Sequence, residues 1–334
     1  MAGLGRFRAL VATEQGVPPA FAEVGEESLG EGEVTVEVAY SSLNYKDALA
    51  TTATAPVVRR FPLTIGIDLA GSVVASSDPG FSVGDEVLVA GGGLGEDHPG
   101  AYARYARVPA EWCVRLPEGL GAVGAMALGT AGLTAMLCCA ALERNGATPE
   151  RLGGEPVLVT GAAGGVGSYA VALLGRLGYT VVASTGRVEE AAYLSALGAA
   201  RVVGREELAP VGRGPLGPVS FASAIDVVGG ATLAEVLRRT APNGTVAACG
   251  LAGGSQLEST VYPFILRGVV LAGVNSVTLH AEERRATWSR LGALLPDGLA
   301  GTVARVEALS EVASLAPEVL AGRVRGRVVL DVAR

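Results

Sequence analysis

Histidine, cysteine and aromatic residues are scarce in this chain of 334 residues. The chain has two histidines and four cysteines, at positions His98, His280, Cys113, Cys138, Cys139 and Cys249. No Cys-x-x-Cys pair and no His-Glu-x-x-His stretch occurs, so the ligand spacing of a structural zinc site is missing. The adjacent cysteines lie in an apolar run, as buried thiols of a reducing compartment do. We therefore expect a cytoplasmic protein with no metal site, and the N-terminal segment has no signal-peptide pattern.

Basic residues are also in short supply. Lysine and arginine number 26 against 33 acidic residues, which gives a net charge of −7. Nucleic-acid binding depends on lysine and arginine neutralising phosphates, so this charge balance argues against a general nucleic-acid binder. Any anionic ligand must therefore be held by a local arrangement of donors.

One uncharged run, from Gly119 to Leu142, is long enough to span a bilayer. It contains five glycines and has neither a basic flank nor an aromatic belt. We therefore interpret it as a buried core segment and expect no membrane span.

Glycine is abundant, with 48 residues, and the length exceeds what one hydrophobic core normally fills. The first 120 residues show short β-branched runs separated by turn residues, with one short helix expected over 45–50. Beyond residue 122, strands alternate with helices, and helices are predicted over 122–145 and 282–295. This pattern predicts an α/β protein with a doubly wound parallel sheet. We assign residues 1–124 and 296–334 to a β-rich domain, which the strand in GRVRGRVVLDVAR rejoins, and residues 125–295 to the doubly wound domain.

The sharpest motif is VLVTGAAGGVGS at 157–168, where an apolar strand enters a glycine turn and an apolar helix leaves it. That context is typical of a Rossmann dinucleotide site, because glycines let a pyrophosphate approach the backbone N–H groups at a helix N-terminus. Gly164 and Gly167 take the second and third glycine positions, while Ala162 replaces the first. The expected cradle is Ala163, Gly164, Gly165, Val166 and Gly167. A tight strand–helix turn without a ligand is the alternative.

The next strand ends in VVASTGR at 181–187, about twenty residues beyond Gly164. A site for NAD(H) normally has a carboxylate here for the ribose hydroxyls, and this segment has none. Ser184, Thr185 and Arg187 instead suit a 2′-phosphate, since they offer hydroxyls and a guanidinium. NADPH is therefore the expected cofactor, and the alternative is that Arg187 only caps the next helix.

These motifs, together with YSSLNYKDALA, FPLTIGIDLAG, GTAGLTAM, ACGLAGG and YPFILRGVVLAGVNSV, span nearly the whole chain. The chain resembles the zinc-free medium-chain dehydrogenase/reductases, and within them the acrylyl-CoA reductase branch, whose members are often labelled quinone oxidoreductases. The resemblance implies a GroES-like β-rich catalytic domain, a Rossmann domain, and NADPH-dependent reduction of an activated C=C bond, with acryloyl-CoA as the leading substrate. SSLNYKD and IGIDLAG, where zinc members carry ligands, contain neither cysteine nor histidine.

The resemblance also implies residue roles. Asn44 and Tyr45 would be the catalytic residues and would face the nicotinamide and the substrate where the domains meet. Tyr45 would order the cofactor or donate a hydrogen bond, although a packing role is the simpler alternative. Asp47 is expected to cap the short helix, and Lys46 to be solvated. The remaining cofactor contacts implied are Thr130, Gly250, Leu251, Asn275, Ser276 and Arg327. Arg59 and Arg60 would either meet a CoA phosphate or form a solvated pair.

Two alternative functions remain open, and the sequence also predicts an oligomeric state. An NADPH:quinone oxidoreductase would use the same hydride chemistry on a flat acceptor, and a non-catalytic NADPH-binding protein would bind without turnover. The apolar run GVVLAGV, at 268–274, predicts an edge strand that pairs with a second copy, hence a homodimer. We expect a small-molecule substrate, either an acyl-CoA thioester or a quinone.

Overall fold

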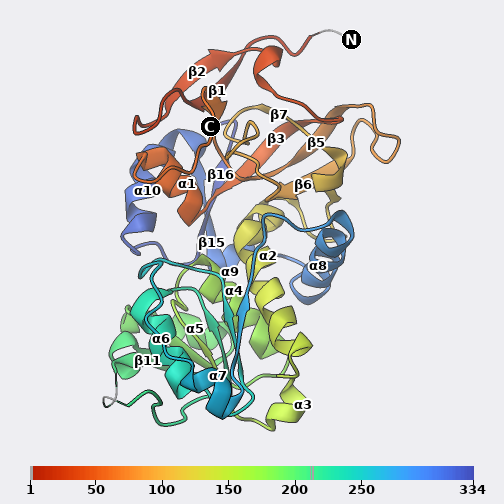
Figure 1. Cartoon of the computed structure of the whole chain (residues 1–334). Coiled ribbons are helices and arrows are strands. Elements are labelled where there is room, and N and C mark those ends of the chain that lie inside the picture. The colour runs from red at the N-terminus through yellow and green to blue at the C-terminus, as the bar shows by residue number, and fades with distance from the viewer. Residues whose placement is uncertain (1–2, 211, 213) are drawn as a thin grey trace. The chain divides into compact units, whose positions relative to one another are not determined.

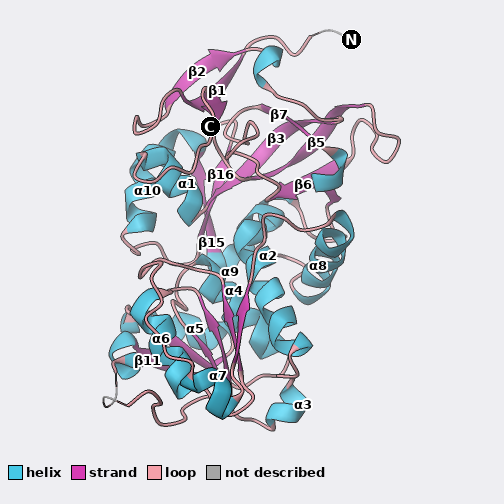
Figure 2. Cartoon of the chain, in the orientation of Figure 1, coloured by secondary structure: helices cyan, strands magenta, loops and turns pink. Residues whose placement is uncertain are grey.

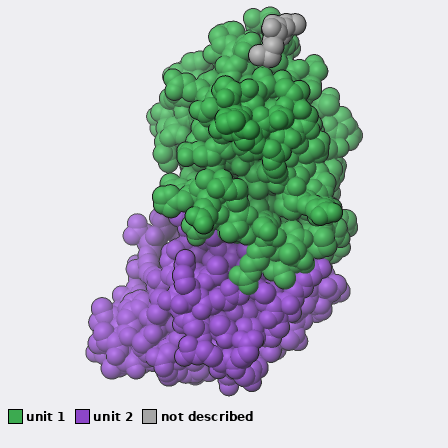
Figure 3. Space-filling view, turned by 90° about the vertical axis from the view of Figure 1, so that its right-hand side faces the viewer, with its two compact units in different colours: residues 1–133, 276–334 green, residues 134–275 purple. Residues whose placement is uncertain are grey.

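A computed structural model describes residues 3–210, 212 and 214–334. The chain forms two compact units, one up to residue 133 and from 276 onward, the other from Thr134 to Asn275 (Figure 3). These limits differ from the boundaries expected at 124/125 and 295/296. Helix α8 (Ala281–Leu294) belongs to the first unit, where it contacts strand β8 and buries Trp288 and Leu291. The alternation of strands and helices does not reveal this, because alternation carries no information on which sheet a helix covers.

The first unit contains an antiparallel seven-stranded sheet with one parallel pair at its end (Figure 1). The strands are β15 (Ala304–Ala308), β16 (Arg327–Asp331), β3 (Val34–Leu43), β5 (Asp68–Ser76), β6 (Glu86–Ala90) and β8 (Val114–Arg115), in that order, with β7 (Tyr105–Val108) on β3. Strand β16 pairs with β3, with Val328 opposite Leu43. The C-terminal strand therefore rejoins the N-terminal sheet, as predicted.

A smaller sheet, the first part of α2 (Ala122–Arg144) and four further helices also belong to the first unit. The sheet has the order β2 (Ala20–Val24), β1 (Phe7–Ala12) and β4 (Leu63–Thr64). The helices are α1 (Tyr45–Thr52), α8, α9 (Ala300–Val303) and α10 (Val312–Leu320). Helices α1 and α10 pack together, and Ala48, Val312 and Ala316 share a core with Leu43 and Val328. This shared core holds the end of β3 and the start of α1, and with them the segment 41–47, against α10 and β16.

The second unit is a six-stranded parallel sheet with helices packed around it (Figure 2). Its order is β11 (Ala199–Gly204), β10 (Val181–Thr185), β9 (Val157–Val159), β12 (Ser223–Asp226), β13 (Thr245–Ala248) and β14 (Val270–Gly273). The helices are α3 (Pro149–Leu152), α4 (Gly165–Arg176), α5 (Ala191–Leu197), α6 (Gly230–Arg239) and α7 (Tyr262–Arg267). In chain order this is the 3-2-1-4-5-6 arrangement of Rossmann folds, with its switch point between β9 and β12.

Helix α2 (Ala122–Arg144) is a core helix with a break in it. It is the one described helix long and apolar enough to cross a membrane, but 89% of its most apolar window is buried inside the structure. The expectation of a core segment is confirmed. The break lies at Gly129, whose φ of 47° and ψ of −151° leave the helical region. The apolar pattern of this segment is otherwise continuous and does not indicate the break.

Helix α1 begins with a cap made by Asn44 and Asp47. The Asp47 Oδ2 atom accepts from the backbone N–H of Asn44 at 2.9 Å, and Oδ1 accepts from the N–H of Ile67 at 3.0 Å. The expectation that Asp47 caps this helix is confirmed. Burial, and after it the nearby charge of Asp68, raises the pKa of the Asp47 carboxyl to about 7.

Asp47 should give folding stability a measurable dependence on pH. Because its pKa is raised on folding, the folded state holds a proton that the unfolded chain loses from about pH 4 upward. Its contribution to stability is complete below the unfolded pKa and declines until pH reaches about 7. Urea unfolding at pH 5 and pH 8 should therefore show wild type losing about 2 kcal/mol relative to the Asp47→Asn variant between these pH values. A relative gain in wild-type stability over that range would contradict the raised pKa.

Candidate functional site

The phosphate-loop motif forms the strand–turn–helix expected for it. Strand β9 ends at Val159, the chain turns at Gly161 with a φ of 57°, and Gly164 precedes the first residue of α4. A Cβ at Gly167 would collide with the Gly161 carbonyl oxygen, so only glycine permits this close packing of helix on turn. The first turn of α4 thereby leaves backbone N–H groups for an anion, which the helix dipole also favours.

The tip of β10 lies beside this loop. The Arg187 Nη2 atom donates to the carbonyl oxygen of Ala163 at 3.0 Å, and the Arg187 N–H donates to Thr185 Oγ1 at 3.0 Å. Arg187 Nη1 is also 3.9 Å from Glu190 Oε1. Ser184 and Thr185 are both buried. The structure therefore brings Arg187 to the phosphate loop, while Thr185 holds the backbone of the strand tip.

A second arginine, which sequence reasoning missed, stands at the same edge. Arg205 follows the neighbouring strand β11, is exposed, and makes no hydrogen bond or ion pair among the described residues. Its guanidinium lies against Gly186, where a Cβ would overlap Nη2. Arg187 and Arg205 thus flank a residue that has no side chain. The only signal for Arg205 was its position at the end of an adjacent parallel strand.

The switch point between β9 and β12 is organised by a buried carboxylate. Asp226 accepts from Thr160 Oγ1 at 2.7 Å and from the N–H of Gly229 at 2.7 Å. Burial raises the pKa of Asp226, an effect that these hydrogen bonds partly offset. Gly250 and Leu251 follow the C-terminal end of the neighbouring strand β13. A Cβ at Gly250 would collide with the carbonyl of Val227, and Leu251 is 57% exposed. Asn275 is likewise exposed, just after β14.

In the first unit the NYKD motif forms the start of α1. Tyr45 is 39% exposed, and its hydroxyl has no hydrogen-bond partner among the described residues. Asn44 is only 7% exposed. Lys46 is not simply solvated, because its Nζ atom pairs with Glu96 Oε1 at 2.8 Å. Arg59 Nη2 approaches the other Glu96 oxygen to 3.4 Å, while Arg60 is exposed and makes no ion pair within the described part of the chain.

A buried polar cluster lies behind Asn44, and we call it the Asp68 hub. It consists of Ser42, Asn44, Asp68, Thr130 and Arg327, all within the first unit. Asp68 is fully buried. Sequence reasoning used IGIDLAG for the family resemblance and as a segment without zinc ligands and gave Asp68 no role, although an aspartate in an apolar strand is itself a signal of a buried polar site.

The hub changes the interpretation of Arg327. Its Nη1 donates to Asn44 Oδ1 at 2.8 Å, its Nη2 to Ser42 Oγ at 2.8 Å, and its Nε to the Ala127 carbonyl at 3.2 Å. With 4% of its surface exposed, Arg327 is engaged by the protein itself. We therefore assign it to the hub and withdraw it from the expected cofactor contacts.

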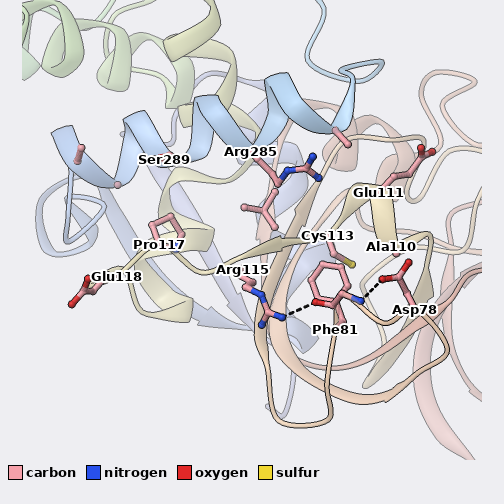
Figure 4. Close-up of a pocket in the computed structure, with 15 residues that line it drawn as sticks. Asp78, Phe81, Ala110, Glu111, Cys113, Arg115, Pro117, Glu118, Arg285 and Ser289 are labelled. Atoms are coloured by element: carbon pink, nitrogen blue, oxygen red, sulfur yellow. Dashed lines mark hydrogen bonds between the residues drawn. The ribbon is translucent and has the colours of Figure 1, made fainter.

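The first unit also has a cavity of about 820 Å³ that contains none of the expected site residues (Figure 4). It lies between α8, strand β8 and the turn at 78–81, and Phe81, Cys113, Arg115 and Arg285 are among the residues that line it. Burial raises the pKa of Cys113 to about 12, so this thiol is not a nucleophile near neutral pH. The cavity therefore has no part in the site described above.

Among the described residues no group of three or more histidine, cysteine or acidic side chains could hold a metal ion. In the first unit the polar side chains of Ser42, Asn44 and Asp68 are committed to the hub. The donor set therefore does not fit a catalytic zinc.

Known families and proteins match almost the entire chain. The alcohol dehydrogenase GroES-like domain matches residues 30–118, and the zinc-binding dehydrogenase family matches residues 165–294. The acrylyl-CoA reductase AcuI of Ruegeria pomeroyi is 49% identical over 301 residues, which cover 90% of each chain. YhfP of Bacillus subtilis, which carries the name of a quinone oxidoreductase, is 45% identical over 92% of each chain.

Solved structures agree with these matches. YhdH of Escherichia coli K-12 with bound NADPH superposes with a TM-score of 0.92 at 47% identity, covering 97% of this chain and 99% of that one. The Bacillus subtilis yhfP structure, with NAD bound, gives a TM-score of 0.91 at 42% identity over 98% and 99%. The expected fold class is confirmed, and the chain belongs to the medium-chain dehydrogenase/reductase family of oxidoreductases, with its GroES-like and Rossmann-type domains.

Proposed function

We propose that this enzyme uses NADPH to reduce a carbon–carbon double bond conjugated to a thioester, with acryloyl-CoA giving propionyl-CoA. The observation that carries this proposal is the near full-length similarity to an acrylyl-CoA reductase and to a structure that holds NADPH. The phosphate loop and the two arginines at the neighbouring strand tips supply the chemistry that such a cofactor needs.

In this proposal residues of the second unit, together with Ser276 of the first, bind the cofactor. The N–H groups at the start of α4 hold the pyrophosphate, and Ala163 to Gly167 line it. Arg187 and Arg205 bind the 2′-phosphate, with Ser184 and Thr185 shaping the strand tip. Gly250, Leu251, Asn275 and Ser276 lie after β13 and β14, where doubly wound folds bind ligands, and are proposed as further contacts.

The first unit would supply the substrate-side groups. When bound, the cofactor supplies a hydride for the β-carbon of the alkene. Negative charge then develops on the thioester carbonyl oxygen, and a proton at the α-carbon completes the reduction. The Tyr45 hydroxyl is exposed and unpartnered among the described residues, so it is the group we propose to donate a hydrogen bond to that oxygen. Thr130 is proposed to act near the nicotinamide carboxamide.

A quinone reductase is the second candidate, because YhfP of Bacillus subtilis carries that name. Both reactions would use the same hydride and the same cofactor residues. They differ in the acceptor, which is an alkene conjugated to a thioester in one case and a flat aromatic ring in the other.

Steady-state kinetics with NADPH would separate the two candidates. We expect kcat/KM for acryloyl-CoA to exceed that for naphthoquinones by at least about tenfold. A higher kcat/KM for the quinone would reverse the order. Cofactor binding without turnover of either acceptor would favour a non-catalytic NADPH-binding protein instead.

The two arginines predict the cofactor preference. Arg187→Ala and Arg205→Ala should each raise the KM for NADPH about tenfold and leave that for NADH nearly unchanged, since each removes one charge-assisted contact worth about 1.5–3 kcal/mol. Arg201→Ala is the matched control, because Arg201 is an exposed arginine on β11 that pairs with Glu207. Equal effects on both cofactors would refute the assignment to the 2′-phosphate.

We also propose that the protein is a homodimer. Strand β14 is the last strand of its sheet, so one edge carries unpaired backbone groups. Beside it on α7 and just before it, Val261, Tyr262, Ile265 and Leu266 are 43% to 67% exposed. A second copy can pair β14 with β14 across a two-fold axis and cover this apolar surface.

Light scattering coupled to size-exclusion chromatography would test the dimer. Ile265→Asp should shift wild-type dimers to monomers, since it places a charge in the proposed interface. Val83→Asp is the control, because Val83 is 71% exposed in the other unit. A wild-type protein that elutes as a monomer would refute the proposal.

The compartment is proposed to be the cytoplasm. All four cysteines are free, and three of them are buried. Thiols that persist unpaired are typical of reducing compartments.

A further inference from the structure

The Asp68 carboxylate is the centre of the hub because it accepts four hydrogen bonds. Its Oδ2 atom accepts from Ser42 Oγ at 2.5 Å, from Asn44 Nδ2 at 2.8 Å and from the Thr130 N–H at 2.9 Å. Its Oδ1 atom accepts from Thr130 Oγ1 at 2.6 Å. Each donor is directed at a fully buried acceptor, so the three residues have little rotational freedom.

Arg327 completes the restraint on Asn44. The Asn44 amide donates through Nδ2 to Asp68 and to Asp47, and accepts through Oδ1 from Arg327 at 2.8 Å. Both ends of the amide are therefore used inside the protein. Asn44 has no polar group left for a nicotinamide or a substrate, which argues against the catalytic role expected for it.

The break in α2 permits the contact with Thr130. A Cβ at Gly129 would lie 2.5 Å from Asp68 Oδ2 and 2.8 Å from Arg327 Nη2. Glycine lets the backbone approach, and the break frees the Thr130 N–H for Asp68. The hub therefore fixes two of the expected site residues, Asn44 and Thr130, through one carboxylate.

We propose that Asp68 is a positioning residue, which fixes Asn44 at the start of α1 so that Tyr45, the next residue, presents its hydroxyl in one orientation. This inference rests on the proposed function, in which Tyr45 contacts the substrate. Tyr45 carries the polar group of this segment that has no partner among the described residues, and its backbone follows directly from a residue held by three side chains. Asp68 acts on the reaction through Asn44 and Tyr45, without touching the reacting atoms.

A double-mutant cycle on kcat tests this proposal. Asp68→Asn keeps the shape of the side chain but removes its charge and turns one acceptor into a donor. We expect Asp68→Asn and Tyr45→Phe each to lower kcat about tenfold, with KM for NADPH changed less than about twofold. In the Tyr45→Phe background, Asp68→Asn should lower kcat by less than about threefold, because the hydroxyl that it positions is already gone.

If the double variant instead lowers kcat by the product of the two single effects, the proposal is overturned, because a purely structural Asp68 acts independently of the Tyr45 hydroxyl. An unchanged kcat in either single variant would also overturn it. Asp331→Asn is the control for aspartate removal, since Asp331 lies at the far end of β16 outside the hub. If Asp68→Asn does not fold, Ser42→Ala removes one donor to Asp68 and enters the same cycle with the same criteria.

The cycle also separates this inference from the proposed substrate. It is measured with the acceptor that wild type reduces faster, acryloyl-CoA or a naphthoquinone. A quinone preference refutes the proposed function, while coupling between Asp68 and Tyr45 with that quinone still supports the positioning role.

Discussion

A charged carboxylate sealed inside the first unit is the constraint on which much of this structure depends. Moving an isolated carboxylate out of water costs many kcal/mol, so Asp68 requires donors on every side. Those donors come from β3, from Asn44 at the start of α1 and from α2, while Arg327 of β16 forms an ion pair with Asp68 at 3.7 Å. Satisfying one buried charge therefore ties the C-terminal strand, the broken helix and the NYKD segment together.

In the second unit, hydrogen-bond donors serve to bind an anion from outside the protein. A protein with a net charge of −7 must attract a highly anionic cofactor. In the proposed function it would do so with backbone N–H groups at the start of α4 and with two guanidinium groups at neighbouring strand tips. Such local donors act at short range, where screening by salt and the charge of the remaining surface matter little.

Much of the fold could be predicted from the sequence because its signals are local. Alternating strands and helices, the glycine turn at 161–167 and the cap at Asp47 all depend on residues close together in the chain. What was missed depends on long-range contacts. Asp68 bonds with Thr130 across 62 positions and Ser42 with Arg327 across 285. No single sequence motif contains both members of either pair, so the motifs alone do not indicate the hub. Arg205 was missed for the same reason, since strand order decides that it lies beside Gly186.

The missing side chain of Gly186 determines where the Arg205 guanidinium can lie. The guanidinium of Arg205 occupies the space where a β-carbon would stand, so any other amino acid at this position would push it aside. In the proposed function, discrimination between phosphorylated and unphosphorylated nucleotides would thus depend both on Arg205 and on the hydrogen atom of Gly186 that makes room for it. A side chain at Gly186 would therefore displace the Arg205 guanidinium from its present place and change the proposed phosphate contact, with every cationic residue still in the chain.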